Sequence, residues 1–342
     1  PSHPERQMFS PRQQEGLELF ARKVLIQEYT LDLLPRCFRW MHGVVDSEDI
    51  PLNVSRETVQ SSRTIQQIRR VVTGRLISHL AELQEKEPEQ YTKFWKTFGM
   101  FIKEGVATDE QNSEKLKPLL VFHSTKHPDE FITLQQYVDE MPEDQQRIYY
   151  LLGEDESALR NSPHLELVEE QDVDVLLFSS TVDPFMLIKL KSFADKDLVN
   201  VAMEGQQPKD LTEEESEVDA IETQTLIGRF KAVLGDKVSD IRITDRLTRS
   251  PARLVNAEGA MTPEMQRVYE LLKQDHEETP KVLEINPEHP LVEGIINLPE
   301  GDAKFSLLVN QLFENTLLLE GIHPDPASMI DRIQQIMQQT LD

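Results

Sequence analysis

An acidic segment near the middle of the chain is the feature that most constrains how it can fold. Between residues 204 and 222 the sequence holds eight acidic residues and one lysine, with few apolar side chains. Such a run repels itself and cannot form a buried core. We therefore predict an exposed linker at 204–222 with a folded domain on each side. The 342 residues are enough for each domain to bury its own core.

The net charge of the chain limits the classes of partner that it can bind. With 61 acidic against 36 basic side chains, the formal net charge is -25, which repels phosphate backbones and anionic membranes. No apolar run approaches the roughly 18 to 20 residues that a membrane span needs, and no hydrophobic signal region follows Pro1. The single cysteine, Cys37, excludes an internal disulfide framework. We predict a cytoplasmic protein that binds neither nucleic acid nor membrane.

The start of the chain and its glycines bear on nucleotide binding. The first residue is Pro1 rather than Met, and residues 1–16 are polar with three prolines, so we expect a piece of a longer protein. Neither of the two common glycine-rich phosphate-binding motifs occurs among the 13 glycines. The sequence therefore predicts no phosphate cradle of its own.

The first domain is predicted to begin with a buried strand at Val24–Ile26 and a compact helix at Leu31–Met41. A polar loop follows, and Ser55 is suited to cap the helix that starts there. A second amphipathic helix is predicted from near Pro88 to Gly105. The first helix has an apolar stripe at steps of three and four, which consists of Ile65, Ile68, Val72, Leu76, Leu80 and Leu83. The second buries Tyr91, Phe94, Trp95, Phe98 and Ile102.

Residues 148–201 alternate between short apolar runs and helical stretches. The runs are Ile148–Leu152, Val173–Phe178 and Leu198–Val201, with helices predicted from Glu156 and Pro184. This alternation is typical of a small parallel β/α unit.

The region after the acidic segment is predicted to be α+β. Ile241 and Ile243 alternate with polar residues, and a second strand is expected near Leu254. From Thr262 onward the pattern is helical. The last two helices cannot cover both apolar stripes by pairing only with each other, so we predict a homodimer through a four-helix bundle. The predicted interface residues are Leu308, Leu312, Leu319, Ile330, Ile333 and Met337.

Arg56 is the first candidate site residue. A cation at the start of a helix is unusual, because the positive end of the helix dipole disfavours it. It can form a salt bridge to Asp46, Glu48 or Asp49, or it can point at an anion such as a nucleotide phosphate. The pattern of residues leaves both interpretations open.

Other chemistry is less well supported. His123 and His127 are four residues apart, but no third ligand is nearby and we predict no metal site. Cys37 lies near Phe38 and Trp40, which predicts a buried thiol rather than a nucleophile. No nucleophile elbow occurs, so a nucleophilic hydrolase is not predicted.

A second candidate site is an amphipathic helix with methionines at its leading end. Met261, Met265, Val268 and Tyr269 share one helical face directly after a polar loop. Such a stripe can be ordinary core, or it can be an adaptable surface that accepts varied apolar partners.

Several segments together carry a family resemblance. The loop Gly43–Glu57, read Gly-Val-Val-Asp-Ser-Glu-Asp-Ile-Pro-Leu-Asn-Val-Ser-Arg-Glu, resembles the signature loop of the ninety-kilodalton heat-shock protein family of chaperones, of the bacterial HtpG type. The likeness continues from about residue 17 to the end. It also rests on Phe98–Gly105, Ser124–Lys126, Tyr137–Pro142, Ile148–Tyr150 and Leu283–Pro287.

The resemblance implies a fold and a division into domains. It implies a truncated α/β middle domain at 1–203, followed by the linker and an α+β C-terminal dimerisation domain at 223–342. Within the middle domain it implies a catalytic loop at 43–60, a helical coil at 57–120 and a small α/β unit at 121–203.

The resemblance also implies an ATP-dependent chaperone of the stress response. In that family the arginine that matches Arg56 reaches the γ-phosphate of ATP, and the glutamine that matches Gln60 supports the same loop. ATP and Mg²⁺ belong to an amino-terminal domain that this chain lacks, so we expect the chain alone to bind neither and to be inactive as an ATPase. Unfolded or partly folded client proteins are held by an aromatic that matches Phe185 and by the helix that carries Met261 and Met265.

This chain departs from the family pattern at several positions, and two other functions are alternatives to a chaperone. Val121 stands where the family often has arginine, and Phe185 stands where the bacterial client site has tryptophan, with Pro184 replacing an acidic residue. The rival from another class is a dimeric interaction scaffold without a nucleotide cycle. A weaker alternative is a related ATPase that uses a lysine from its second domain, against which the Ser55–Glu57 sequence argues.

Overall fold

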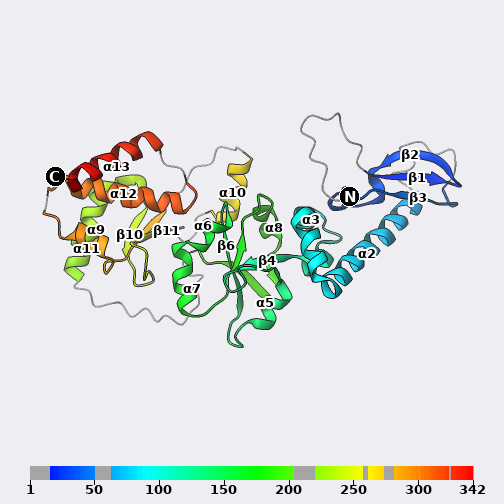
Figure 1. Cartoon of the computed structure of the whole chain (residues 1–342), viewed down its shortest axis with the longest axis horizontal. Coiled ribbons are helices and arrows are strands. Elements are labelled where there is room, and N and C mark those ends of the chain that lie inside the picture. The colour runs from blue at the N-terminus through cyan, green and yellow to red at the C-terminus, as the bar shows by residue number, and fades with distance from the viewer. Residues whose placement is uncertain are drawn as a thin grey trace. The chain divides into compact units, whose positions relative to one another are not determined.

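The structure is a computed structural model of the chain. It describes residues 16–50, 63–203, 220–256, 261–272, 281–299, 301–322 and 325–341. The chain divides into two compact units, and Figure 1 labels their elements. The first unit comprises residues 1–122, 131–139 and 185–194, and the second comprises 123–130, 140–184 and 195–342.

A three-stranded sheet opens the first unit, with β1 (Leu17–Ala21) between β2 (Val24–Thr30) and β3 (Val44–Asp46). The β1–β2 hairpin turns on Arg22 and Lys23, both at positive φ, as a two-residue hairpin turn requires. The strand predicted at Val24–Ile26 is confirmed, but its predicted burial is wrong. Val24 is 52% exposed, whereas Leu17, Leu19 and Ala21 of β1 are buried, because β1 alone turns an alternating apolar face inward.

The predicted helix at Leu31–Met41 is also wrong. The structure has two 3₁₀ turns there, η1 (Leu31–Leu33) and η2 (Arg36–Phe38). Pro35 separates them, since it disfavours helical backbone at the preceding residue and Leu34 is extended at φ -138° and ψ 151°.

The two predicted long helices are confirmed as α2 (Arg63–Lys86) and α3 (Pro88–Thr108), which pack together. The predicted start of α2 near Ser55 lies outside the described residues. Helix α3 continues past Gly105, the predicted end, to Thr108. A Cβ atom at Gly105 would come within 2.6 Å of Leu116 and 2.9 Å of Cys37. This glycine therefore permits close packing inside the helix rather than ending it.

The remaining elements of the first unit are short. They include α4 (Ser113–Leu116), the first half of β4 (Val121–Ser124), β5 (Ile132–Thr133), α5 (Leu134–Glu140), α8 (Asp183–Lys189) and β8 (Ser192–Phe193). Their core is aromatic, because α3 buries Tyr91, Trp95 and Phe98 and Trp40 stacks on Phe98 at 4.5 Å between ring centroids.

The second unit contains the predicted parallel β/α arrangement. Strand β6 (Arg147–Leu152) pairs in parallel with β7 (Leu176–Phe178) on one side and with β9 (Lys196–Asn200) on the other. Helices α6 (Glu156–Arg160) and α7 (Glu166–Glu170) belong to the same region. Its core consists of Tyr149, Leu151, Leu159, Leu165, Val168, Val175, Leu177, Val199 and Val201.

A second sheet in this unit has the strand order β10-β12-β11. Strands β10 (Asp240–Ile243) and β11 (Ala252–Val255) agree with the prediction, whereas the central strand β12 (Val282–Ile285) was not predicted. The region after Thr262 is therefore not helical throughout. Four residues with Glu284 in their middle are too short and too mixed to indicate a strand by pattern.

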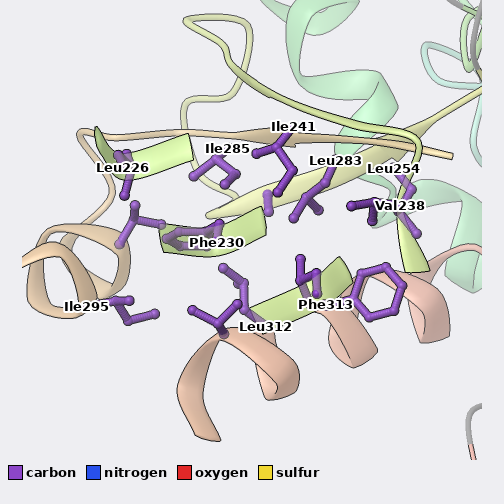
Figure 2. Packing of buried hydrophobic residues seen from close by; sticks show 14 of the residues in the cluster. Leu226, Phe230, Val238, Ile241, Leu254, Leu283, Ile285, Ile295, Leu312 and Phe313 are labelled. Atoms are coloured by element: carbon purple, nitrogen blue, oxygen red, sulfur yellow. The ribbon is translucent and has the colours of Figure 1, made fainter. Parts of the chain in front are cut away.

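Helices cover one face of this sheet. They are α9 (Ala220–Leu234), α11 (Pro290–Ile296) and α12 (Ala303–Leu319). Helix α13 (Pro326–Leu341) packs on α12, and α10 (Pro263–Leu271) belongs to the same unit. Figure 2 shows Phe230 of α9 among Leu283 and Ile285 of the sheet and Leu312 and Phe313 of α12. Most of the predicted acidic linker lies outside the described residues, and α9 begins at Ala220 inside its predicted range.

The opposite face of the sheet carries a buried ion pair. Arg253 and Glu284 are register partners on β11 and β12, and their side chains meet at 2.6 Å with 1% and 8% exposed. Removing either partner would leave a buried charge without compensation. Within the described residues, no helix is long and apolar enough to cross a membrane.

Candidate functional site

The predicted methionine helix is α10, a helix of nine residues in the second unit, but it begins at Pro263, so Met261 lies two residues before the helix rather than on it. Met265 is 38% exposed, and Met261, Val268 and Tyr269 are half-buried. Leu272, directly after the helix, is 53% exposed. The four predicted residues therefore come together in one short segment that is accessible at the surface of the unit, rather than in its core.

Two polar side chains of α10 contact the small parallel sheet and the residues that follow β6. Glu264 is 7% exposed, and its Oε1 accepts hydrogen bonds from the Tyr150 hydroxyl at 2.8 Å and the Asn200 amide at 2.9 Å. Burial and the Glu264 carboxylate raise the pKa of Tyr150, so the hydroxyl stays protonated and acts as the hydrogen-bond donor. One turn later Arg267 pairs with Glu154 at 2.5 Å.

A cavity of about 240 Å³ lies beside α10, and a charged triad lines it. His164 is 2% exposed and its Nε2 lies 2.7 Å from Glu320 Oε1, while Lys281 donates to Glu320 Oε2 at 3.1 Å. Burial alone would raise the pKa of Glu320, but His164 and Lys281 lower it to about 2. The triad joins the end of α12 to residues near α7.

The last two helices expose apolar side chains, but not all those predicted. Leu319, Ile330 and Met337 are 45%, 53% and 60% exposed. Leu308 and Ile333 are half-buried. Leu312 is 2% exposed within the core of the unit, so its assignment to an interface with another chain is corrected. It lies on the inner face of α12 and has no surface to offer a partner.

Helix α13 is held against α12 by one ion pair and a half-buried stripe. Arg332 of α13 pairs with Glu314 of α12, whose side chain is 10% exposed. The half-buried positions Met329, Ile333 and Ile336 follow helical spacing on the same side. No residue of α13 is fully buried, although α12 buries Phe305, Val309, Leu312 and Phe313.

The other predicted client residue, Phe185, lies on α8 in the first unit and is half-buried. It neighbours Pro184 and the buried Met186. Phe185 belongs to the first unit and α10 to the second, so their grouping into one client site stays a prediction.

The predicted catalytic residues Arg56 and Gln60 lie outside the described residues. The described part of their loop ends at Ile50, which is buried. In this part Asp46 accepts a hydrogen bond from the Lys23 backbone N–H at 3.2 Å. Both interpretations of Arg56 therefore stay predictions.

The remaining candidate residues have ordinary partners. His123 lies 2.7 Å from Glu156, and His127 lies 2.8 Å from Glu140. Among the residues that the structure describes, no group of three potential ligands is arranged to hold a metal ion. Cys37 is buried as predicted, and burial raises the pKa of its thiol to about 12, which keeps it unreactive.

Sequence reasoning did not identify Glu264, Tyr150 and Asn200. One signal was available, because Glu264 stands in the first turn of a predicted helix, where a carboxylate is favoured by the helix dipole. Nothing local indicated that it would be buried, since Tyr150 lies 114 residues away in the chain.

Comparison with known proteins gives a consistent family. The model of the family described as "Hsp90 protein" matches residues 1–342. Among curated relatives, the chaperone protein HtpG of Cupriavidus necator is 40% identical over 333 residues, which cover 94% of this chain and 52% of that protein. The HtpG proteins of Ruthia magnifica and Legionella pneumophila are 36% and 35% identical, each over 98% of this chain and 55% of their own length.

The chain thus spans about half the length of the curated relatives it matches. Because the family model covers the whole sequence, the chain belongs to the Hsp90 family, and the predicted resemblance is confirmed.

Proposed function

We propose that this chain is the client-binding and dimerising part of an ATP-dependent Hsp90-type chaperone. The family membership supports a chaperone, and the relatives that match are named chaperone protein HtpG. The proposed clients are unfolded or partly folded proteins, which expose the apolar side chains that folded proteins bury.

The exposed apolar surface of α10 is the observation that carries this proposal. Met265 and Leu272 are accessible, and Met261 lies one turn before Met265. Methionine is unbranched and polarisable, so a methionine surface can repack against partners of different shape. A surface of this kind suits many clients bound weakly rather than one partner bound tightly.

Crosslinking of an unfolded client tests the role of α10. We expect the double change Met261→Glu and Met265→Glu to lower crosslinking about tenfold while the fold survives, because charges oppose apolar contact. Leu291→Glu is a matched control, since Leu291 is 41% exposed on α11, outside the proposed surface. Equal crosslinking by the wild type and the double variant would mean that Met261 and Met265 have a structural role and do not bind clients.

We also propose that the chain forms a homodimer through α12 and α13. The exposed residues Leu319, Ile330 and Met337 support this, whereas Leu308 and Ile333 are half-buried. The unit covers α13 on one side only, and a second copy of the chain would cover the other side by symmetry.

In the whole protein, Arg56 and Gln60 would act on ATP and Mg²⁺ held by an amino-terminal nucleotide-binding domain. This part of the proposal rests on the family resemblance, because neither residue is among those described. The guanidinium of Arg56 would stabilise negative charge on the γ-phosphate. No residue described here is assigned to the nucleotide.

The second candidate function is a dimeric scaffold without a nucleotide cycle, favoured only by the same exposed surfaces. Joining this chain to the amino-terminal half of the Cupriavidus necator relative separates the two functions. The chaperone proposal expects ATP hydrolysis that falls about a hundredfold or more with Arg56→Ala. Hydrolysis that is unaffected by this change, or absent in the joined protein, would favour the scaffold.

A further inference from the structure

Helix α10 is too short to be stable by itself. It has nine residues, whereas isolated helices shorter than about 12 to 15 residues are marginal in water. None of its described apolar side chains is fully buried, and Glu264 is the only described residue of the helix that is. The helix therefore depends on contacts other than an apolar core.

The contacts of Glu264 are arranged by the neighbouring sheet. Tyr150 and Asn200 are register partners on the parallel strands β6 and β9, so their side chains lie on the same face near the carboxyl ends of these strands. Both are buried, at 6% and 4% exposed. The sheet thus presents two donors side by side before α10 contributes anything.

Each donor is fixed in its orientation. The Tyr150 ring packs edge-on against Phe178, with 5.3 Å between centroids. The Asn200 Oδ1 accepts a hydrogen bond from the Ala202 N–H at 3.0 Å, which leaves its Nδ2 to face Glu264. Two preoriented neutral donors make a site for one carboxylate oxygen.

Glu264 suits this site because it stands in the first turn of α10, where the helix dipole favours a negative charge. Arg267 lies three residues later, on the same side of the helix, and pairs with Glu154, two residues after the end of β6. Figure 1 shows α10 beside the β6 end of the small sheet. All the polar contacts of α10 described above thus reach this sheet region.

We propose that Glu264 is a positioning residue for the client surface. The Tyr150 hydroxyl and the Asn200 amide hold its carboxylate, and this contact keeps α10 helical and seated on the small sheet with Met265 exposed. We call this set of hydrogen bonds among Glu264, Tyr150 and Asn200 the latch. What α10 binds rests on the proposed function, whereas the latch itself does not.

Hydrogen–deuterium exchange of the 261–272 segment in the 342-residue chain tests the latch. We expect Glu264→Ala to speed exchange there about tenfold or more, and Glu264→Gln to have a smaller effect because its amide oxygen still accepts both hydrogen bonds. Exchange in β10 and β12 should stay unchanged. Glu293→Ala is the matched control, since Glu293 is an exposed glutamate in the first turn of α11.

Tyr150→Phe provides a test that keeps the core intact, because only the hydroxyl is lost. We expect it to speed exchange in α10 several-fold, and to add nothing further when combined with Glu264→Ala, since Glu264→Ala already removes the hydrogen bond that Tyr150→Phe removes. Unchanged exchange in α10 for folded Tyr150→Phe and Glu264→Ala would overturn the latch.

Client crosslinking at Met265 separates the latch from the proposed function. If exchange rises and crosslinking falls, both are supported. If exchange rises while crosslinking is unchanged, the latch stands and the client role of α10 fails. If exchange does not rise, the latch fails whatever the crosslinking shows.

Discussion

Helices α10 and α13 both expose apolar side chains in the second unit, but with different residues. The accessible apolar residues of α10 are Met265 and Leu271, each 38% exposed, and Met261 lies four residues before Met265. Helix α13 exposes Ile330, Met337 and Leu341, which are 53%, 60% and 87% exposed and follow helical spacing. A methionine surface adapts to varied shapes, whereas a longer stripe with a stiff, β-branched isoleucine suits one fixed partner. This difference supports the proposed assignment of α10 to clients and of α13 to a second copy of the chain.

Helix α10 and the end of α12, the helix on which α13 packs, also differ in how they are anchored. The carboxylate of Glu264 holds α10 through the neutral side chains of Tyr150 and Asn200. The carboxylate of Glu320, directly after α12, is instead held by His164 and Lys281. A contact with basic groups depends on pH and on charge, so the two anchors should respond differently to the same change of conditions.

The largest effect is expected from charges placed on α13. The double change Ile330→Glu and Met337→Glu should raise the dimer dissociation constant at least about a thousandfold, or roughly 4 kcal/mol, because charges would be buried at an apolar interface. Analytical ultracentrifugation over a range of concentrations measures this constant.

The matched control changes Gln335 and Gln338 to Glu, since both are exposed on the polar side of α13. Dimerisation should weaken far less with these two charges. A wild-type chain that stays monomeric at micromolar concentration would contradict the proposed dimer interface on α13. A control variant that dissociates as much as the double variant would do the same.

A smaller effect is expected from the Glu320 anchor. Its pKa of about 2 in the folded chain is below its ordinary value of 4.5. The contribution is therefore complete above about pH 4.5 and is lost as the pH falls toward 2, by about 3 kcal/mol for this difference in pKa. Urea unfolding of the second unit at several pH values should show it.

The comparison variant is Glu320→Gln, which cannot lose a proton. The difference in unfolding free energy between wild type and variant should be large at pH 6 and should shrink below about pH 4. Glu293→Gln, at an exposed carboxylate, should give no such trend. If the difference for Glu320 were the same at pH 6 and pH 3, His164 and Lys281 would not be the anchor that the geometry indicates.

A third effect concerns how α13 is attached. Arg332→Ala should lower the free energy of unfolding by about 2 kcal/mol, because Glu314 would lose its cation while nearly buried. Amide exchange in 326–341 should rise as well. The double change Arg332→Met and Glu314→Gln should recover part of the loss, since neither charge then remains unpaired. A double variant less stable than Arg332→Ala would contradict this account.

The sequence predicted those parts of the fold whose apolar residues repeat at a regular spacing. Helices α2, α3, α12 and α13 were predicted because their stripes recur every three or four residues. The helix predicted at Leu31–Met41 failed because Pro35 outweighs the apolar content around it. The central strand β12 was missed because its identity depends on β10 and β11, which flank it only after folding.

The candidate site also has one part that the sequence predicted and one part that it did not. The methionine surface was predicted because it is local, with Met265, Val268 and Tyr269 on α10 and Met261 two residues before it. The latch was not, because Glu264, Tyr150 and Asn200 meet only through the packing of α10 on the small sheet. Leu312 was placed on the wrong face, because an apolar stripe does not show which of its residues face the chain's own core.

The smallest effect on stability is expected from Met265→Ile, which tests the comparison most directly. Both side chains are apolar and Met265 is 38% exposed, so the free energy of unfolding should change by less than about 0.5 kcal/mol. Isoleucine is stiff, so crosslinking should fall for some unfolded clients and persist for others. Met337→Ile on α13 should leave dimerisation within about 0.5 kcal/mol, because a fixed partner does not need an adaptable residue. If Met265→Ile lowered the binding of all clients equally, the adaptability of the methionine side chain would not distinguish α10 from α13. The contacts that anchor the helices would then be the remaining difference between them.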